Sequence, residues 1–82
     1  TLIKLLWVRS FSEIYNPCMA VKVLKGLIDR GYQSELCMVG PDSDGSLKKV
    51  KKLAKQLNVN VTFTGKLTKQ EWIQLSECFQ YI

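Results

Sequence analysis

The residues best suited to chemistry lie in one short stretch near the N-terminus. Arg9 and Ser10 follow an apolar run over residues 2–8, and Asn16-Pro17 then opens an amphipathic helix. A strand, a loop and a helix start in this order can hold a phosphate, because unpaired backbone N–H groups at a helix N-terminus point toward an anion. A guanidinium at the end of a strand suits a bidentate phosphate contact. We therefore expect Arg9 to bind phosphate, and an ion pair with Glu13 is the alternative for this side chain.

This stretch contains none of the common phosphate motifs. No glycine precedes Gly26, which excludes the Gly-x-Gly-x-x-Gly dinucleotide fingerprint, and the Gly-Lys-Ser/Thr of a P-loop is absent. A phosphoacceptor pocket of the response-regulator type needs a carboxylate at the end of the first strand, where Arg9 and Ser10 stand. The anion site, if built here, depends on Arg9 and the helix start.

Metal and thiol chemistry are poorly supported. The chain has no histidine, and Asp42 and Asp44 in Asp-Ser-Asp-Gly are more typical of a turn and helix cap than of a metal site. The three cysteines, Cys18, Cys37 and Cys78, show no Cys-x-x-Cys spacing, which predicts free thiols in a reducing compartment. No apolar run approaches the ~20 residues of a membrane span.

The basic charge is concentrated in one segment. The net charge is +5, and one predicted helix carries five lysines, Lys48, Lys49, Lys51, Lys52 and Lys55. Such a cluster can attract nucleic acid or anionic lipid. A solvated helix face is the simpler interpretation, and we favour it.

The elements that must position these residues alternate between strands and helices. Strands are predicted at residues 2–8, 35–40 and 60–65, with a fourth beginning at Tyr81-Ile82. Helices are predicted from Asn16 to Gly31, over the apolar stripe of residues 47–57, and after a Thr68–Glu71 capping box, with Trp72, Leu75 and Phe79 on one face. The order βαβαβα(β) predicts an α/β fold with a parallel sheet. Ligands of such sheets bind at the carboxyl ends of the strands, here the loops 9–16, 40–46 and 65–68.

The length of 82 residues allows one small domain. The chain begins with Thr1 and its last residues read as a strand that is just starting. We therefore expect residues 1–82 to be a single, truncated domain of a longer protein.

The motifs together resemble a known family. The segment Leu-Leu-Trp-Val-Arg-Ser-Phe-Ser-Glu-Ile-Tyr-Asn-Pro of residues 5–17 is similar to the opening of the C-terminal domain of group 1 glycosyltransferases, which are retaining enzymes of the GT-B fold. The likeness continues through residues 36–41 (Leu-Cys-Met-Val-Gly-Pro), 53–57 and 61–67, so it covers essentially the whole chain in four ordered segments. The sequence of the first segment is similar to that of a bacterial subgroup of this family.

The resemblance implies a Rossmann-like, three-layer half of a GT-B C-terminal domain that binds a nucleotide-sugar donor. It implies sugar transfer with retention to a carbohydrate or lipid-linked acceptor held by a further N-terminal domain, in the cytoplasm, with no metal or other cofactor. The donor diphosphate would lie against Arg9, Ser10 and Tyr15, and the nucleobase against the backbone of Gly65, Lys66 and Leu67. The segment alone would be inactive, because the family's later Glu-x7-Glu segment is not in it.

The sequence departs from the family at the diphosphate residues. Aligned without gaps, the family's Gly falls on Arg9, its Arg on Ser10 and its Lys on Tyr15. Arg9 is thus one position early, which on a strand reverses the side of the sheet. Either a variant phosphate site or a degenerate domain that serves as a scaffold or binding subunit fits this pattern. The lysine helix leaves two weaker alternatives open, a nucleic-acid-binding module and peripheral association with a membrane.

Overall fold

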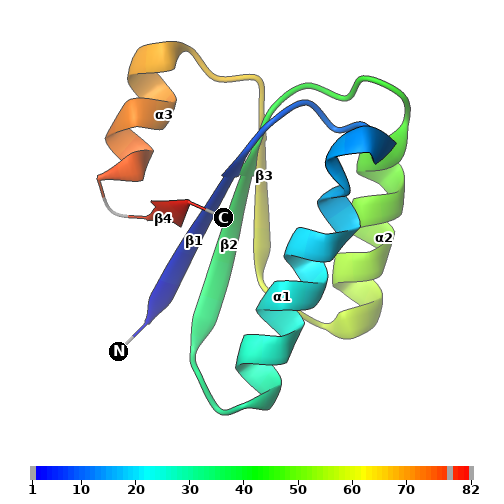
Figure 1. Cartoon of the computed structure of the whole chain (residues 1–82), viewed down its shortest axis with the longest axis vertical. Helices are drawn as coiled ribbons and strands as arrows, with labels where there is room; N and C mark the ends of the chain where they lie inside the picture. The colour runs from blue at the N-terminus through cyan, green and yellow to red at the C-terminus, as the bar shows by residue number, and fades with distance from the viewer. Residues whose placement is uncertain (1, 78, 82) are drawn as a thin grey trace.

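The chain folds into a parallel sheet with helices on both faces (Figure 1). The computed structural model describes residues 2–77 and 79–81. In chain order the elements are β1 (Ile3–Val8), the short 3-10 helix η1 (Glu13–Tyr15), α1 (Pro17–Asp29), β2 (Ser34–Val39), α2 (Ser46–Leu57), β3 (Val61–Gly65), α3 (Lys69–Ser76) and β4 (Gln80–Tyr81). The strands stand in the order β3-β2-β1-β4, and every neighbouring pair is parallel. The α/β fold and the parallel sheet expected from the sequence are confirmed.

Alternation along the central strands divides the core into two layers. Leu5, Trp7, Leu36 and Met38 pack under α1 and α2 in the larger cluster, whereas Leu6, Cys37 and Val39 face α3 in the smaller one. Successive side chains of a strand point to opposite faces, so a strand buried on both sides reads as a continuous apolar run. This explains why β1 and β2 contain few polar residues.

Helix α2 forms because its apolar residues repeat at helical spacing. Val50 and Ala54 are buried, and Leu47, Leu53 and Leu57 pack around the same cluster. The helix ends at Asn58, whose φ of +53° is the left-handed conformation that terminates many helices. The predicted stripe is confirmed, and of the two asparagines that could end the helix, Asn58 and Asn60, Asn58 is the one that does.

Helix α3 starts with the predicted capping box. The Thr68 hydroxyl accepts a hydrogen bond from the Glu71 N–H at 3.3 Å, and the Thr68 N–H donates to Glu71 Oε1 at 3.1 Å. Trp72, Leu75 and Phe79 pack against the smaller core cluster, but α3 ends at Ser76, so Phe79 lies beyond the helix in which it was expected. The fourth strand includes Tyr81, and the part of the prediction that concerned Ile82 lies outside the described residues.

Two cysteines of the described part of the chain are free thiols. Cys37 is buried in the sheet, and Cys18 is half-buried at the start of α1. Burial disfavours the charged thiolate, and the nearby Glu35 carboxylate adds repulsion, so the pKa of Cys37 is raised from its ordinary value. The third cysteine of the sequence, Cys78, lies outside the described residues. Among the described helices, none is long and apolar enough to cross a membrane.

Candidate anion site at the carboxyl edge of the sheet

Backbone hydrogen bonds join the three expected loops at the carboxyl edge. The Arg9 N–H donates to Val39 O at 3.1 Å, and the Phe11 N–H donates to Pro41 O at 2.8 Å, so the loop after β1 continues to follow the loop after β2. The Gly40 N–H donates to Gly65 O at 2.9 Å and links the loop after β3. The predicted functional edge is therefore one connected surface.

Gly40 allows the first two loops to approach each other closely. A Cβ placed on Gly40 would lie 1.8 Å from the carbonyl oxygen of Arg9, and the φ of Gly40 is +147°. No side chain can occupy that space without moving the backbone, and residues other than glycine rarely adopt this conformation. The glycine that ends β2 thus fixes the position of Arg9.

Phe11 anchors the loop after β1 in the core. Its side chain is only 1% exposed, and its ring lies 4.9 Å from the ring of Trp7 and 6.1 Å from that of Phe63, measured between centroids. The polar residues around Phe11 indicate an exposed loop, and for Phe11 this expectation is wrong. The loop is held from below by an aromatic cluster, which gives Arg9 and Tyr15 a fixed base.

Asp44 is bonded to two helix starts at once. Its Oδ1 accepts hydrogen bonds from the Ser46 N–H at 3.1 Å and from the Ser46 hydroxyl at the start of α2. Its Oδ2 accepts from the Glu13 N–H at 3.1 Å at the start of η1. The Ser46 hydroxyl and then the Glu13 N–H favour the carboxylate, so the pKa of Asp44 lies below its ordinary value. The predicted turn is confirmed, whereas the N-cap position of α2 is occupied by Gly45, with Asp44 bonded to the N–H of the first helical residue. The link to η1 is an addition that the sequence did not indicate.

Glu13 pairs with Lys49 and leaves Arg9 without that partner. The Lys49 ammonium lies 2.8 Å from Glu13 Oε1, which raises the pKa of Lys49 above its ordinary value. Both side chains are well exposed, so the pair contributes little to stability. The alternative reading of Arg9 as the ion-pair partner of Glu13 is therefore wrong.

Arg9 instead lies over Tyr15. The guanidinium carbon is 5.9 Å from the centre of the Tyr15 ring, within the range of a cation–π contact. Arg9 continues the alternation of β1, and both it and Trp7 line a pocket of about 270 Å³ whose other walls are Tyr15, Asn16, Met19, Ala20 and Val23. Two of the three residues predicted for a diphosphate are thus brought together on the α1 side of the sheet.

Asn16 stands at the corner of this pocket in an uncommon conformation. It precedes α1 as predicted, but its φ of +48° and ψ of +59° are left-handed, and its side chain makes no capping hydrogen bond. Asparagine is one of the few residues that tolerate this conformation. The position of the predicted N-cap is confirmed, whereas its capping role is not, and the amide is left to line the pocket.

The remaining predicted residues lie outside the pocket lining. Ser10 is half-buried next to Arg9 but is not among the lining residues. Gly65 and Lys66 are exposed at the end of β3, two strands away from β1, and Leu67 packs on the α3 face. The nucleobase loop is connected to the loop after β2 by the Gly40–Gly65 hydrogen bond and by the pairing of Val39 with Gly65.

A second cavity of about 270 Å³ lies between the starts of α1 and α2. It is lined by Glu13, Asn16, Pro17, Cys18, Ser46 and Lys49. The sequence predicts Lys49 only as part of the basic face of its helix. No local pattern indicates that it contacts the loop after β1. Asn16 lines both cavities, so the helix start lies between them.

No family model matches this chain, and neither curated proteins nor solved structures show significant similarity to it. Within residues 2–77 and 79–81, no group of three or more histidine, cysteine, aspartate or glutamate side chains is placed to hold a metal ion. Functional inference therefore depends on the geometry of the carboxyl edge.

Proposed function

We propose that this chain binds the diphosphate of a nucleotide-sugar and forms the first half of the donor-binding domain of a retaining, GT-B-type glycosyltransferase. One observation carries the proposal. Arg9 and Tyr15, from a strand end and a short helix, meet at one pocket beside the N-terminus of α1. Parallel sheets bind ligands at this edge, and Arg9 is the guanidinium that the pocket presents.

The size of the pocket fits part of such a donor. Pockets for whole small molecules occupy about 300–1,000 Å³, and this pocket has about 270 Å³. It suits a diphosphate next to Arg9, while the sugar would lie beyond the described residues. The displaced position of Arg9 is no obstacle, because the alternation of β1 directs the side chain toward α1, where Tyr15 supports it.

In this proposal Arg9 would act mainly on the leaving diphosphate. Transfer of the sugar increases the negative charge on the diphosphate, so a fixed guanidinium stabilises the transition state more than the bound donor. Tyr15 would hold the guanidinium plane, and Gly65, Lys66 and Leu67 would offer backbone groups to the base. The bond-breaking step also requires groups that these residues do not include.

Nucleotide titration of two arginine variants tests the proposal. UDP, GDP and ADP are titrated by calorimetry into the wild type, Arg9→Ala and Arg30→Ala, the last being a matched control at the opposite end of α1. Charge-assisted hydrogen bonds contribute about 1.5–3 kcal/mol. We expect Arg9→Ala to weaken the preferred nucleotide by roughly 10- to 100-fold and Arg30→Ala to leave its affinity unchanged. If all three nucleotides bind Arg9→Ala as tightly as the wild type, the site assignment is wrong.

The hydrogen bonds of the loop favour a second candidate, a domain of the same fold that has lost donor binding and serves as a scaffold. Asp44 already accepts the Glu13 N–H, and Lys49 is already paired with Glu13. Two groups that could bind a phosphate, the Glu13 N–H and the Lys49 ammonium, are therefore already bonded to carboxylates of the chain itself. Absence of heat with all three nucleotides, from a wild type that is folded by circular dichroism, would select this candidate.

A further inference from the structure

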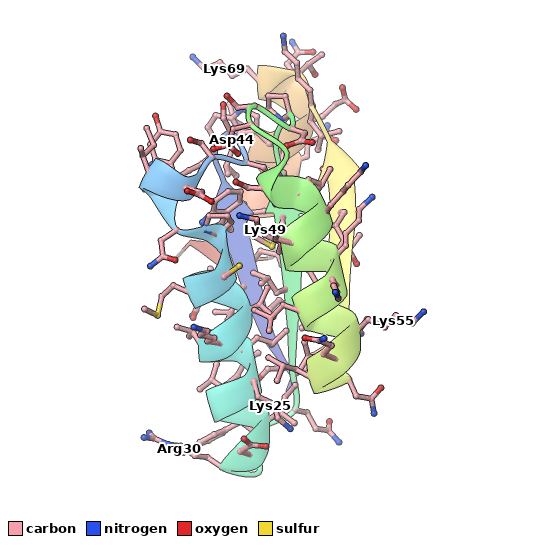
Figure 2. All side chains as sticks on the ribbon, turned by 90° about the vertical axis from the view of Figure 1, so that its right-hand side faces the viewer. Lys25, Arg30, Asp44, Lys49, Lys55 and Lys69 are labelled. Atoms are coloured by element: carbon pink, nitrogen blue, oxygen red, sulfur yellow. The ribbon has the colours of Figure 1, made fainter. Side chains whose placement is uncertain are left out.

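Positive charge is segregated to the layer formed by α1 and α2. The two helices contain seven lysines and a single acidic residue, Asp29. The whole chain carries a net charge of +5, so the remaining residues are slightly acidic overall. Figure 2 views this layer face on, with Lys25 on α1, Lys49 between the two helices and Lys55 projecting outward from α2. The excess charge of the protein therefore belongs to one side.

Four of the five lysines of α2 make no ion pair with a described residue, and one of them, Lys51, lies over the Phe63 ring at the β3 side of the helix. Lys48, Lys52 and Lys55 are exposed and make no ion pair with any described residue, and α2 itself contains no acidic residue. At about 100° per residue, these three positions fall within roughly 60° of one another around the helix. Lys25 and Lys49 are partly offset by Asp29 and Glu13. Three of the four unpaired lysines of α2 thus form a narrow stripe along the helix, while Lys51 lies nearer β3 and the exposed Lys22 lies on α1.

We propose that this stripe, Lys48, Lys52 and Lys55, is an electrostatic docking surface for a membrane that contains anionic lipid. Clusters of lysine on one side of an amphipathic helix are attracted to the negative surface potential of such membranes. The apolar side of α2 is buried against the sheet, with Val50 fully covered. The helix therefore lies on the headgroups and does not insert, and its attachment depends on charge alone.

The surface suits a membrane better than a nucleic acid. Neither α1 nor α2 contains an aromatic residue on which a base could stack, and neither contains an arginine, the commonest reader of guanine edges. Neither of the two described cavities is lined by Lys48, Lys52 or Lys55. Lysines are compact charges on flexible stems, and a fluid array of headgroups requires no fixed geometry from them.

Vesicle co-sedimentation tests the proposal with two matched variants. Lys48→Gln/Lys52→Gln removes charge from the stripe, and Lys66→Gln/Lys69→Gln removes the same charge from the loop after β3 and the start of α3. Each protein is sedimented with vesicles rich in phosphatidylglycerol and with vesicles of phosphatidylcholine alone. Circular dichroism checks that both variants remain folded.

The expected result is binding of the wild type to the anionic vesicles only, with loss in ~1 M salt, where the Debye length is about 3 Å. Each lysine near an anionic surface contributes a factor of about five, so the stripe variant should bind about 25-fold more weakly. The matched variant should retain most of the binding. Equal losses in the two variants would overturn the assignment to α2. If the wild type does not bind the anionic vesicles, the proposal that the stripe docks on a membrane is wrong. Salt-dependent binding to duplex DNA in that case would indicate a nucleic acid as the partner.

Discussion

Substitution of Gly40 by alanine tests the close approach of the two loops that position Arg9. The new Cβ would lie 1.8 Å from Arg9 O, whereas real contacts of this kind are essentially never under 3.0 Å, so the loops must separate by about 1.2 Å. Separation on this scale breaks the Arg9–Val39 hydrogen bond and weakens the Phe11–Pro41 bond.

The cost can be worked out from these contacts. The two backbone hydrogen bonds at about 0.5–1.5 kcal/mol each and about 1–3 kcal/mol for a strained φ give a loss of about 2–6 kcal/mol. The free energy of unfolding of a small domain is about 5–15 kcal/mol, so Gly40→Ala should be severely destabilised. Gly45→Ala is the control, because its φ is also positive at +84° but its Cβ would meet nothing within 4 Å. It should cost only about 1–2 kcal/mol.

Urea unfolding followed by fluorescence measures both variants, because Trp7 is only 4% exposed in the core. If Gly40→Ala is unfolded in water, an excluded osmolyte such as TMAO brings its transition into range. Both variants lose the conformational preference of glycine, so the difference between their free energies of unfolding reports the clash with Arg9. Equal losses for Gly40→Ala and Gly45→Ala would refute the described approach of the loops.

Three further predictions concern the loop and the helix starts. Phe11→Ala should lower the free energy of unfolding by about 3–5 kcal/mol. Ile14→Ala, at a nearby residue that is 81% exposed, should change it by less than about 0.5 kcal/mol. Urea unfolding measures both variants, and equal effects would contradict the core role of Phe11. The pKa of Asp44 is lowered by folding, so its contribution to stability is complete above its ordinary value of 3.8 and is lost as the pH falls through the folded pKa. Asp44→Asn should therefore lose stability less steeply than the wild type in acid, and parallel acid unfolding curves would argue against the two bonded helix starts. Thr68→Ala should lower the free energy of unfolding by about 1 kcal/mol, because the helix cap is lost. Gln70→Ala, in the same exposed turn, is the control in urea unfolding. A loss no larger than that of the control would count against the capping box.

Local periodicity was enough to predict most of the fold. The stripe of α2, the continuous apolar runs of β1 and β2, and the capping box at Thr68 each depend on residues within one or two turns, and all of them are present. The strand order was not predictable in the same way. Pairing of β4 with β1 depends on the crossover through α3 and not on any pattern within β4, which is two residues long.

The candidate site was predicted only in part, because its contacts join residues far apart in the sequence. Arg9 and Tyr15, predicted for one site, are in contact, but no local pattern indicates that Lys49, 36 positions away, pairs with Glu13. Phe11 looked like a loop residue because the residues around it are polar. Its burial depends on Phe63, which arrives from β3, so only the assembled sheet shows it.

The strand order also affects the protein while it is being made. β1 is synthesised before the other three described strands, yet one of its edges pairs with β4, about 70 residues later in the chain. At about 5–20 residues per second, that edge has no partner strand for roughly 4–14 s, and it belongs to the strand that contains Leu5 and Leu6. An unpaired apolar edge can recruit the same strand of another chain. Neighbouring nascent chains on one messenger therefore compete with β4 for β1, and slow synthesis through α3 lengthens that competition.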